Sequence, residues 1–187
     1  MSYIYIVPIE LDDHTYLEKM ERFIFETFHK GTKIEEMQID LAGAFDPKRV
    51  QHNSSLILQQ LIRQPPPDAD KVLGVLDVDL FIPILTFVFG EAELSGDVAI
   101  VSYYRLQNER YGLEPDSTLL LQRLLTESLH EIGHLYGLTH CHEPVCVMRS
   151  STSVEEIDLK SAQYCQFCRK RLPVPTRGAS ARSAHVS

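Results

Sequence analysis

The sequence predicts an α/β fold in which a mostly parallel sheet ends in one antiparallel edge strand. First, strand-like apolar runs alternate with helix-like segments over residues 1–78, an order that favours parallel strands. Second, two strand-like runs at 86–94 and 97–105 are joined by Ser95-Gly96, a tight-turn signal that makes the two runs antiparallel. Third, the segment at about 116–136 repeats its apolar residues at helical spacing, which predicts a long helix after the hairpin.

The N-terminal part of the chain is expected to supply the parallel strands and the helices between them. Three apolar or alternating runs predict strands: 3–9, 33–41 and 71–78. Two segments with apolar residues at helical spacing predict helices: about 16–28 and about 53–63. Three prolines at 65–67 follow the second helix and form a stiff connector, because proline cannot continue a helix.

Composition and charge exclude several classes of protein. The chain has 187 residues and a hydrophobic fraction of 44%, which suits one domain with a sizeable core. Its net charge is −8, with no basic stripe to neutralise phosphates, so we expect no nucleic-acid partner. The longest apolar run, "LFIPILTFVF" at 80–89, is about half a bilayer span and contains Pro83, which favours a buried strand over a membrane helix. The start resembles no signal peptide, so we expect a cytoplasmic protein, and a monomer.

A single domain is expected over residues 1–172. Residues 1–137 supply the sheet and helices, and 138–172 form a C-terminal segment in which Ser153 and Glu156 match a capping box, the start signal of a short helix. The tail 173–187, "PVPTRGASARSAHVS", is small, polar and contains proline, which predicts disorder.

The end of the long predicted helix carries a metal-binding pattern, "HEIGHLYGLTH". His130 and His134 are four residues apart, so their imidazoles share one helix face and can bind one ion. Glu131 lies one step round the helix, where it can act as a general base without being a ligand. Gly137 can adopt positive φ and end the helix, which lets His140 reach the same ion as a third ligand.

The four cysteines all lie in the C-terminal segment, in two closely spaced pairs: Cys141, Cys146, Cys165 and Cys168. Without a secretory signal a reducing compartment is expected, and close pairs then favour a zinc site. Disulfides and free thiols remain as alternatives.

The stretch from His130 to Cys168 resembles the archaemetzincin family of metzincin zinc metallopeptidases. Its pattern is HExxHxxGxxHC, four residues, C-x-M, a spacer and CxxC; the spacer after Met148 is one residue shorter than in the family. The resemblance implies a metzincin-like fold, with a twisted, mostly parallel sheet and its antiparallel edge strand above a cleft, and the zinc-binding helix beneath.

The same resemblance implies the roles of the site residues. A catalytic zinc would be held by His130, His134 and His140, with Glu131 as general base and Met148 in a Met-turn beneath the ion. A second, structural zinc would be held by the four cysteines. Neighbouring side chains outside a helix diverge, so His140 and Cys141 serve two ions better than one, which also favours two zinc ions per chain.

These features predict zinc-dependent hydrolysis of peptide bonds, with a water activated by Glu131. A peptide or protein substrate is expected to add as an antiparallel strand to the sheet edge, at about 87–94. One alternative is a zinc-stabilised peptide- or protein-binding module with little or no turnover. A thiol oxidoreductase built on "CQFC" is less favoured, because it leaves the first pair of cysteines without a task.

Overall fold

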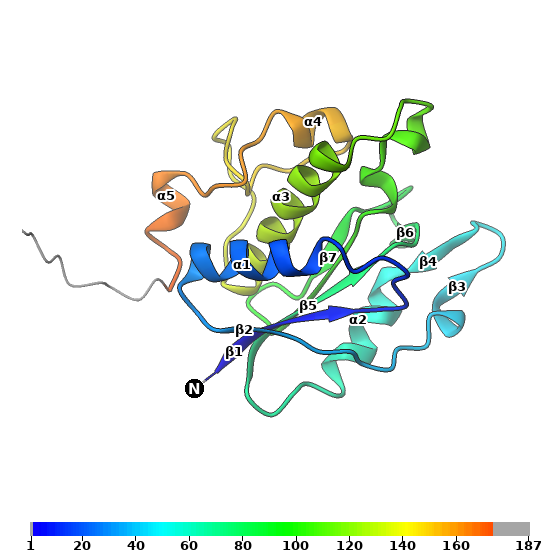
Figure 1. The fold of residues 1–187 in the computed structure, drawn as a ribbon, viewed down its shortest axis with the longest axis horizontal. Helices are drawn as coiled ribbons and strands as arrows, with labels where there is room; N and C mark the ends of the chain where they lie inside the picture. Colours follow the sequence, from blue (N-terminus) through cyan, green and yellow to red (C-terminus); the bar gives the residue numbers. More distant parts are fainter. Residues whose placement is uncertain (1, 174–187) are drawn as a thin grey trace, which may run out of the picture.

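A five-stranded sheet forms the centre of the molecule, which is a computed structural model that describes residues 2–173. The strand order is β2-β1-β5-β8-β7, and β7 alone runs antiparallel to its neighbour (Figure 1). The strands of this sheet are β1 (Tyr3–Pro8), β2 (Thr32–Ile34), β5 (Ala69–Leu76), β7 (Gly90–Ala92) and β8 (Val98–Ser102). The predicted fold, a mostly parallel sheet with an antiparallel edge strand, is thereby confirmed.

Helices cover both faces of this sheet. Helices α1 (Leu17–Phe28) and α3 (Ser117–Leu135) lie on one face, and α2 (Ser54–Ile62) lies on the other (Figure 1). The strands alternate accordingly: Ile4 and Ile6 of β1 join the core under α1 and α3, whereas Tyr5 and Val7 join the core under α2. Strand β8 is buried along its whole length, as expected of a parallel strand covered on both faces.

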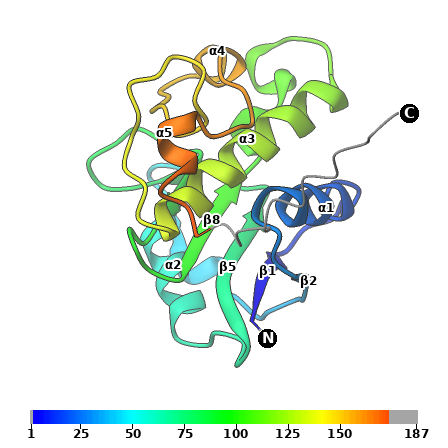
Figure 2. The same cartoon turned by 90° about the vertical axis from the view of Figure 1, so that its left-hand side faces the viewer.

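The chain after α3 packs against that helix on the side away from the sheet (Figure 2). It contains two short helices, α4 (Val154–Asp158) and α5 (Gln166–Arg169). Three short 3-10 helices occur earlier: Ala42–Ala44, Tyr104–Leu106 and Asn108–Tyr111. None of the helices described between residues 2 and 173 is long and apolar enough to cross a membrane. The predicted disordered tail lies, apart from Pro173, outside the described residues.

Two expectations about strands were wrong. The predicted strand 33–41 pairs only over Thr32–Ile34, because the side chain of Gln60 in α2 hydrogen-bonds to the backbone of Asp40. Oε1 of Gln60 accepts from the Asp40 amide at 2.8 Å, and its Nε2 donates to the Asp40 carbonyl at 3.0 Å. The run 86–94 pairs with β8 only over Gly90–Ala92.

A second, three-stranded sheet was not predicted. It has the order β3-β4-β6, formed by β3 (Phe45–Asp46), β4 (Gln51–Asn53) and β6 (Leu80–Phe81). Only the first two residues of the apolar run 80–89 therefore form a strand. The remaining residues of the run lead to β7, and most of them line the cleft that is described below.

Candidate active site

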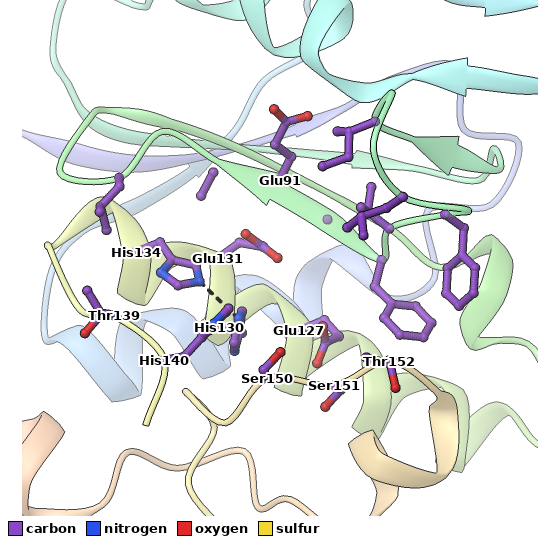
Figure 3. Close-up of a pocket in the computed structure, with 18 of the residues that line it drawn as sticks. Glu91, Glu127, His130, Glu131, His134, Thr139, His140, Ser150, Ser151 and Thr152 are labelled. Carbon is purple, nitrogen blue, oxygen red and sulfur yellow. Dashed lines mark hydrogen bonds between the residues drawn. The ribbon is translucent and has the colours of Figure 1, made fainter. Parts of the chain in front are cut away.

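A cleft of about 640 Å³ separates the edge of the large sheet from α3. One wall consists of β7 and the segment that precedes it, from Ile82 to Phe89. The other wall consists of α3 and parts of the chain after it, Thr139 to His140 and Ser150 to Thr152. The three predicted histidine ligands and Glu131 line this cleft (Figure 3).

The side chains of His130, His134 and His140 converge on one point. Their ligand nitrogens lie within 4.8 Å of one another, and the Nε2 atoms of His130 and His134 are 3.1 Å apart. Two nitrogens bound tetrahedrally to one zinc at 2.0–2.1 Å would be about 3.3–3.4 Å apart. The spacing of these two histidines therefore fits a shared zinc ion.

Hydrogen bonds orient two of the imidazole rings for metal binding. Nδ1 of His130 lies 2.8 Å from the carbonyl of Val147, and Nδ1 of His134 lies 2.7 Å from the carbonyl of Leu138. A carbonyl only accepts, so each Nδ1 carries the proton and each Nε2 keeps its lone pair toward the cleft. Burial lowers the pKa of both histidines, of His130 most strongly, which favours the neutral form that binds a metal.

Gly137 ends the helix as the sequence predicts, with φ of +80°. Its amide donates to the carbonyl of His134 at 2.9 Å, and the amide of Leu138 donates to the carbonyl of Gly133 at 3.0 Å. These two bonds form a Schellman motif, which turns the chain back on itself. His140 thereby returns to the two helical histidines.

Glu131 is buried beside the histidines but faces the cleft between them and β7 (Figure 3). Burial, and then the nearby carboxylate of Glu127, raises the pKa of Glu131 well above its usual range. Gly90 of β7 provides the space, since a Cβ atom there would lie 2.8 Å from Oε1 of Glu131. A carboxyl group with a raised pKa is a stronger base than an exposed glutamate.

Met148 packs against the helix turn between His130 and His134. Its side chain is completely buried, and a Cβ atom on Gly133 would overlap with its sulfur. The methionine therefore contacts the helix turn that carries the two histidines, and its place in a Met-turn beneath an ion stays a prediction.

The four cysteine sulfurs form a second cluster, with all Sγ atoms within 4.8 Å of one another. Cys141 and Cys165 are separated by 3.8 Å between sulfurs, and so are Cys146 and Cys168. Sulfurs bound tetrahedrally to zinc at 2.3 Å are about 3.8 Å apart, whereas a disulfide requires about 2.05 Å. The cluster fits a four-thiolate zinc site, and the cysteines are unpaired.

Two tyrosines close to the metal-binding helix, Tyr136 and Tyr164, do not line the cleft. The hydroxyl of Tyr136 donates to Asp70 at 2.7 Å, and that of Tyr164 donates to the carbonyl of Leu129 at 2.5 Å. Conversely, Glu127 lines the cleft and was missed by sequence reasoning. Its signal was available, because a residue four positions before Glu131 on a helix shares its face.

Comparison with known proteins agrees with this geometry. Residues 48–173 match the sequence pattern of "Peptidase family M54". The chain belongs to this family. It is thus a zinc metallopeptidase, and the predicted relation to archaemetzincins is confirmed.

Three archaeal proteins illustrate the similarity. An archaemetzincin of Methanocaldococcus jannaschii is 48% identical over 129 residues, which cover 69% of this chain and 70% of the relative. The crystal structure of archaemetzincin from Methanopyrus kandleri aligns with a TM-score of 0.79 at 32% identity, over 90% of this chain and 92% of that one. A zinc-dependent peptidase from Methanocorpusculum labreanum aligns with a TM-score of 0.80 at 30% identity, over 90% and 98%.

Proposed function

We propose that this chain hydrolyses peptide bonds in the cleft, with zinc held by His130, His134 and His140 and with Glu131 as the general base. The observation that carries this proposal is the convergence of three imidazoles next to a buried glutamate in one cleft. Two of the imidazoles are also fixed by carbonyl partners in the tautomer that binds metal.

Glu131 would move the protons of the reaction. A zinc ion held by the three histidines would polarise the scissile carbonyl and make a water molecule more acidic. Glu131 accepts a proton as the water oxygen bonds to the carbonyl carbon, and donates it to the nitrogen as the C–N bond breaks. Its raised pKa supports the first transfer, because a base that binds its proton more firmly removes it more readily from water.

The substrate would bind as an extended strand on β7, which is an edge strand with one unpaired side. β7 and α3 run in the same direction: Gly90 lies beside Glu131, and further along both elements the amide of Ser95 donates to the carbonyl of His134 at 2.9 Å. A peptide antiparallel to β7 therefore has its C-terminal part beside residues 85–89. This extends the sequence prediction, which named residues 87–94.

The four cysteines would hold a second zinc with a structural role. A four-thiolate site has no open position for substrate. It would join residues 141–146 to residues 165–168 within the single domain predicted for residues 1–172. The cytoplasmic location, the monomeric state and the lack of a nucleic-acid partner stay predictions.

A zinc-stabilised binding module with little turnover is the competing function. To separate the two, we would measure the zinc content of purified protein and its digestion of a mixed peptide library. Two zinc ions and cleavage that disappears in Glu131→Ala support the peptidase. Two zinc ions without cleavage of any peptide would contradict it and favour the binding module.

A further inference from the structure

A buried ion pair lies at the cleft one helical turn before Glu131. Nζ of Lys160 donates to Oε1 of Glu127 at 2.8 Å and to the carbonyl of Arg149 at 3.1 Å. The side chain of Lys160 is 0% exposed and that of Glu127 is 5% exposed. A pair so far from water has to be satisfied by protein or by a ligand.

Only the glutamate of this pair borders the cleft. Glu127 belongs to the cleft wall, next to Ser150 and Ser151 (Figure 3), whereas Lys160 does not line the cleft. Among residues 2–173, Lys160 is the hydrogen-bond donor to the carboxylate of Glu127, and it binds Oε1. Oε2 thus remains as an acceptor. The hydroxyl of Ser151 is buried and likewise lacks a partner among the described residues.

The position of Glu127 identifies the part of the substrate that it would contact. Glu127 precedes Glu131 along α3, and α3 runs parallel to β7, so Glu127 is level with the segment that precedes Gly90. That segment would accompany the C-terminal part of a peptide bound antiparallel to β7. The side chain directly after the scissile bond is therefore the one that would approach Glu127.

The opposite wall suits a long aliphatic stem. Phe87 and Phe89 line the cleft there, with their ring centroids 5.2 Å apart in an edge-to-face arrangement. A lysine or arginine stem can pack on these rings while its head group donates to two acceptors. An apolar side chain would leave the acceptors unpaired, and an acidic one would add a carboxylate beside Glu127.

We propose that Glu127 selects peptides with lysine or arginine directly after the scissile bond, an inference that rests on the proposed function. The charge of Lys160 offsets that of Glu127, so the preference depends on short hydrogen bonds and not on a long-range field. Hydrogen bonds to charged groups contribute about 1.5–3 kcal/mol, which corresponds to a preference of roughly tenfold to a hundredfold.

The test measures binding, so that it does not depend on turnover. Zinc-loaded protein is titrated by calorimetry with peptides that begin with a zinc-binding hydroxamate, followed by lysine, norleucine or glutamate. Norleucine keeps the stem of lysine and lacks only its ammonium group. We expect the lysine peptide to bind about tenfold to a hundredfold more tightly than the norleucine peptide, and the glutamate peptide to bind most weakly. Equal affinities, or binding of none of the three, would overturn the inference.

The matched variant removes both members of the pair. Glu127→Gln alone would leave Lys160 buried without a counter-charge, whereas Glu127→Met with Lys160→Met replaces the pair by apolar side chains of similar volume. In this double variant the ratio of lysine to norleucine affinity should fall to about one. Loss of a merely structural ion pair would weaken all peptides alike and leave the ratio unchanged, which would refute the selective role. Glu36→Gln, at an exposed carboxylate outside the cleft, should keep the wild-type ratio.

The turnover of peptides with lysine or norleucine after the scissile bond separates this inference from the proposed function. Cleavage of lysine and norleucine peptides at equal kcat/KM would leave the peptidase standing and remove the selectivity. Preferential binding of the lysine peptide without cleavage of any library peptide would support the selectivity and contradict the peptidase.

Discussion

The sulfur of Met148 occupies the space that a side chain at position 133 would need, so a larger residue at the centre of the metal-binding helix turn has to displace the methionine. Gly133→Ala should push Met148 away from the turn that carries His130 and His134. We expect a loss of about 1–3 kcal/mol in the free energy of unfolding, as is usual for overpacking, although alanine is the better helix former. Denaturant unfolding of the zinc-loaded protein measures this loss of free energy.

Two companion variants distinguish overpacking from other causes. Met148→Leu keeps the volume and should cost less than about 1.5 kcal/mol. Met148→Ala combined with Gly133→Ala gives the new methyl group room, so the double variant should lose less than the sum of the two single changes. Additive losses would show that the two residues do not compete for space.

Glu131→Gln should strongly reduce hydrolysis and retain zinc. The amide fills the same space beside Gly90 but cannot accept a proton, so kcat should fall by about a hundredfold to ten-thousandfold. Elemental analysis should find the same zinc content as in the wild type. Loss of zinc together with activity would instead indicate that Glu131 is a ligand.

Gly137→Ala should weaken zinc binding at the histidines. The residue has φ of +80°, a conformation that costs alanine about 1–3 kcal/mol, and relief of that strain would displace His140. Gly112→Ala is the matched control, because Gly112 has φ of +71° and no atom within 4 Å of an added Cβ, at a site remote from the histidines. Both variants should lose stability, but only Gly137→Ala should lose zinc affinity in a competition titration. Equal zinc affinity in the two variants would contradict the link to His140.

Arg49 should control substrate binding without taking part in the chemistry. Its guanidinium donates to the carbonyls of Leu85 and Thr86 at 2.8 and 2.9 Å and lies 4.2 Å from the ring centroid of Phe81. It thereby fixes the segment that forms one cleft wall. Arg49→Ala should raise KM severalfold and change kcat little. Arg22→Ala, which breaks an exposed pair with Glu26, should change neither. A large fall in kcat for Arg49→Ala would place this arginine closer to the reaction than we infer.

The sequence was sufficient for the features that depend on short spacing. His130, Glu131 and His134 lie on α3, where helical geometry defines their arrangement. Gly137 follows the helix and turns the chain so that His140 returns to them. The sequence was insufficient where contacts between distant segments decide the structure. Gln60 ends the pairing after β2 from 20 residues away in sequence, and Lys160 reaches Glu127 across 33 residues. The strands β3, β4 and β6 have two or three residues each, too few for any period to be detected.

Local side-chain competition explains a further difference. Ser153 does precede α4, as the capping-box pattern predicted, but its side chain makes no cap. Glu156 instead accepts from the amide of Thr152 at 2.5 Å and from its hydroxyl at 3.0 Å. The start signal for this helix was therefore correct in position and wrong in partner, because the amide and the hydroxyl of Thr152, one residue earlier, are two donors for the glutamate.

The two zinc ions should differ in what their removal does. The histidine site opens onto the cleft, and α3 is held by its own buried face, so a mild chelator should remove that ion and abolish hydrolysis without unfolding the protein. The large apolar side chains buried on this face are Leu124, Leu129, Ile132 and Leu135. Circular dichroism should stay near native, and added zinc should restore hydrolysis.

Loss of the second ion should release part of the C-terminal segment. Cys146 and Cys168 are buried, so the ion that they share with Cys141 and Cys165 would leave only with a stronger chelator or on thiol alkylation. The segment should not unfold as a whole, because Val147, Met148, Val154 and Ile157 belong to the main core and should keep its middle in place. Faster proteolysis is therefore expected around 141–146 and after 159. Protection of these sites after alkylation of all four cysteines would show that zinc does not hold them, and harder removal of the histidine-bound ion would reverse the assigned roles.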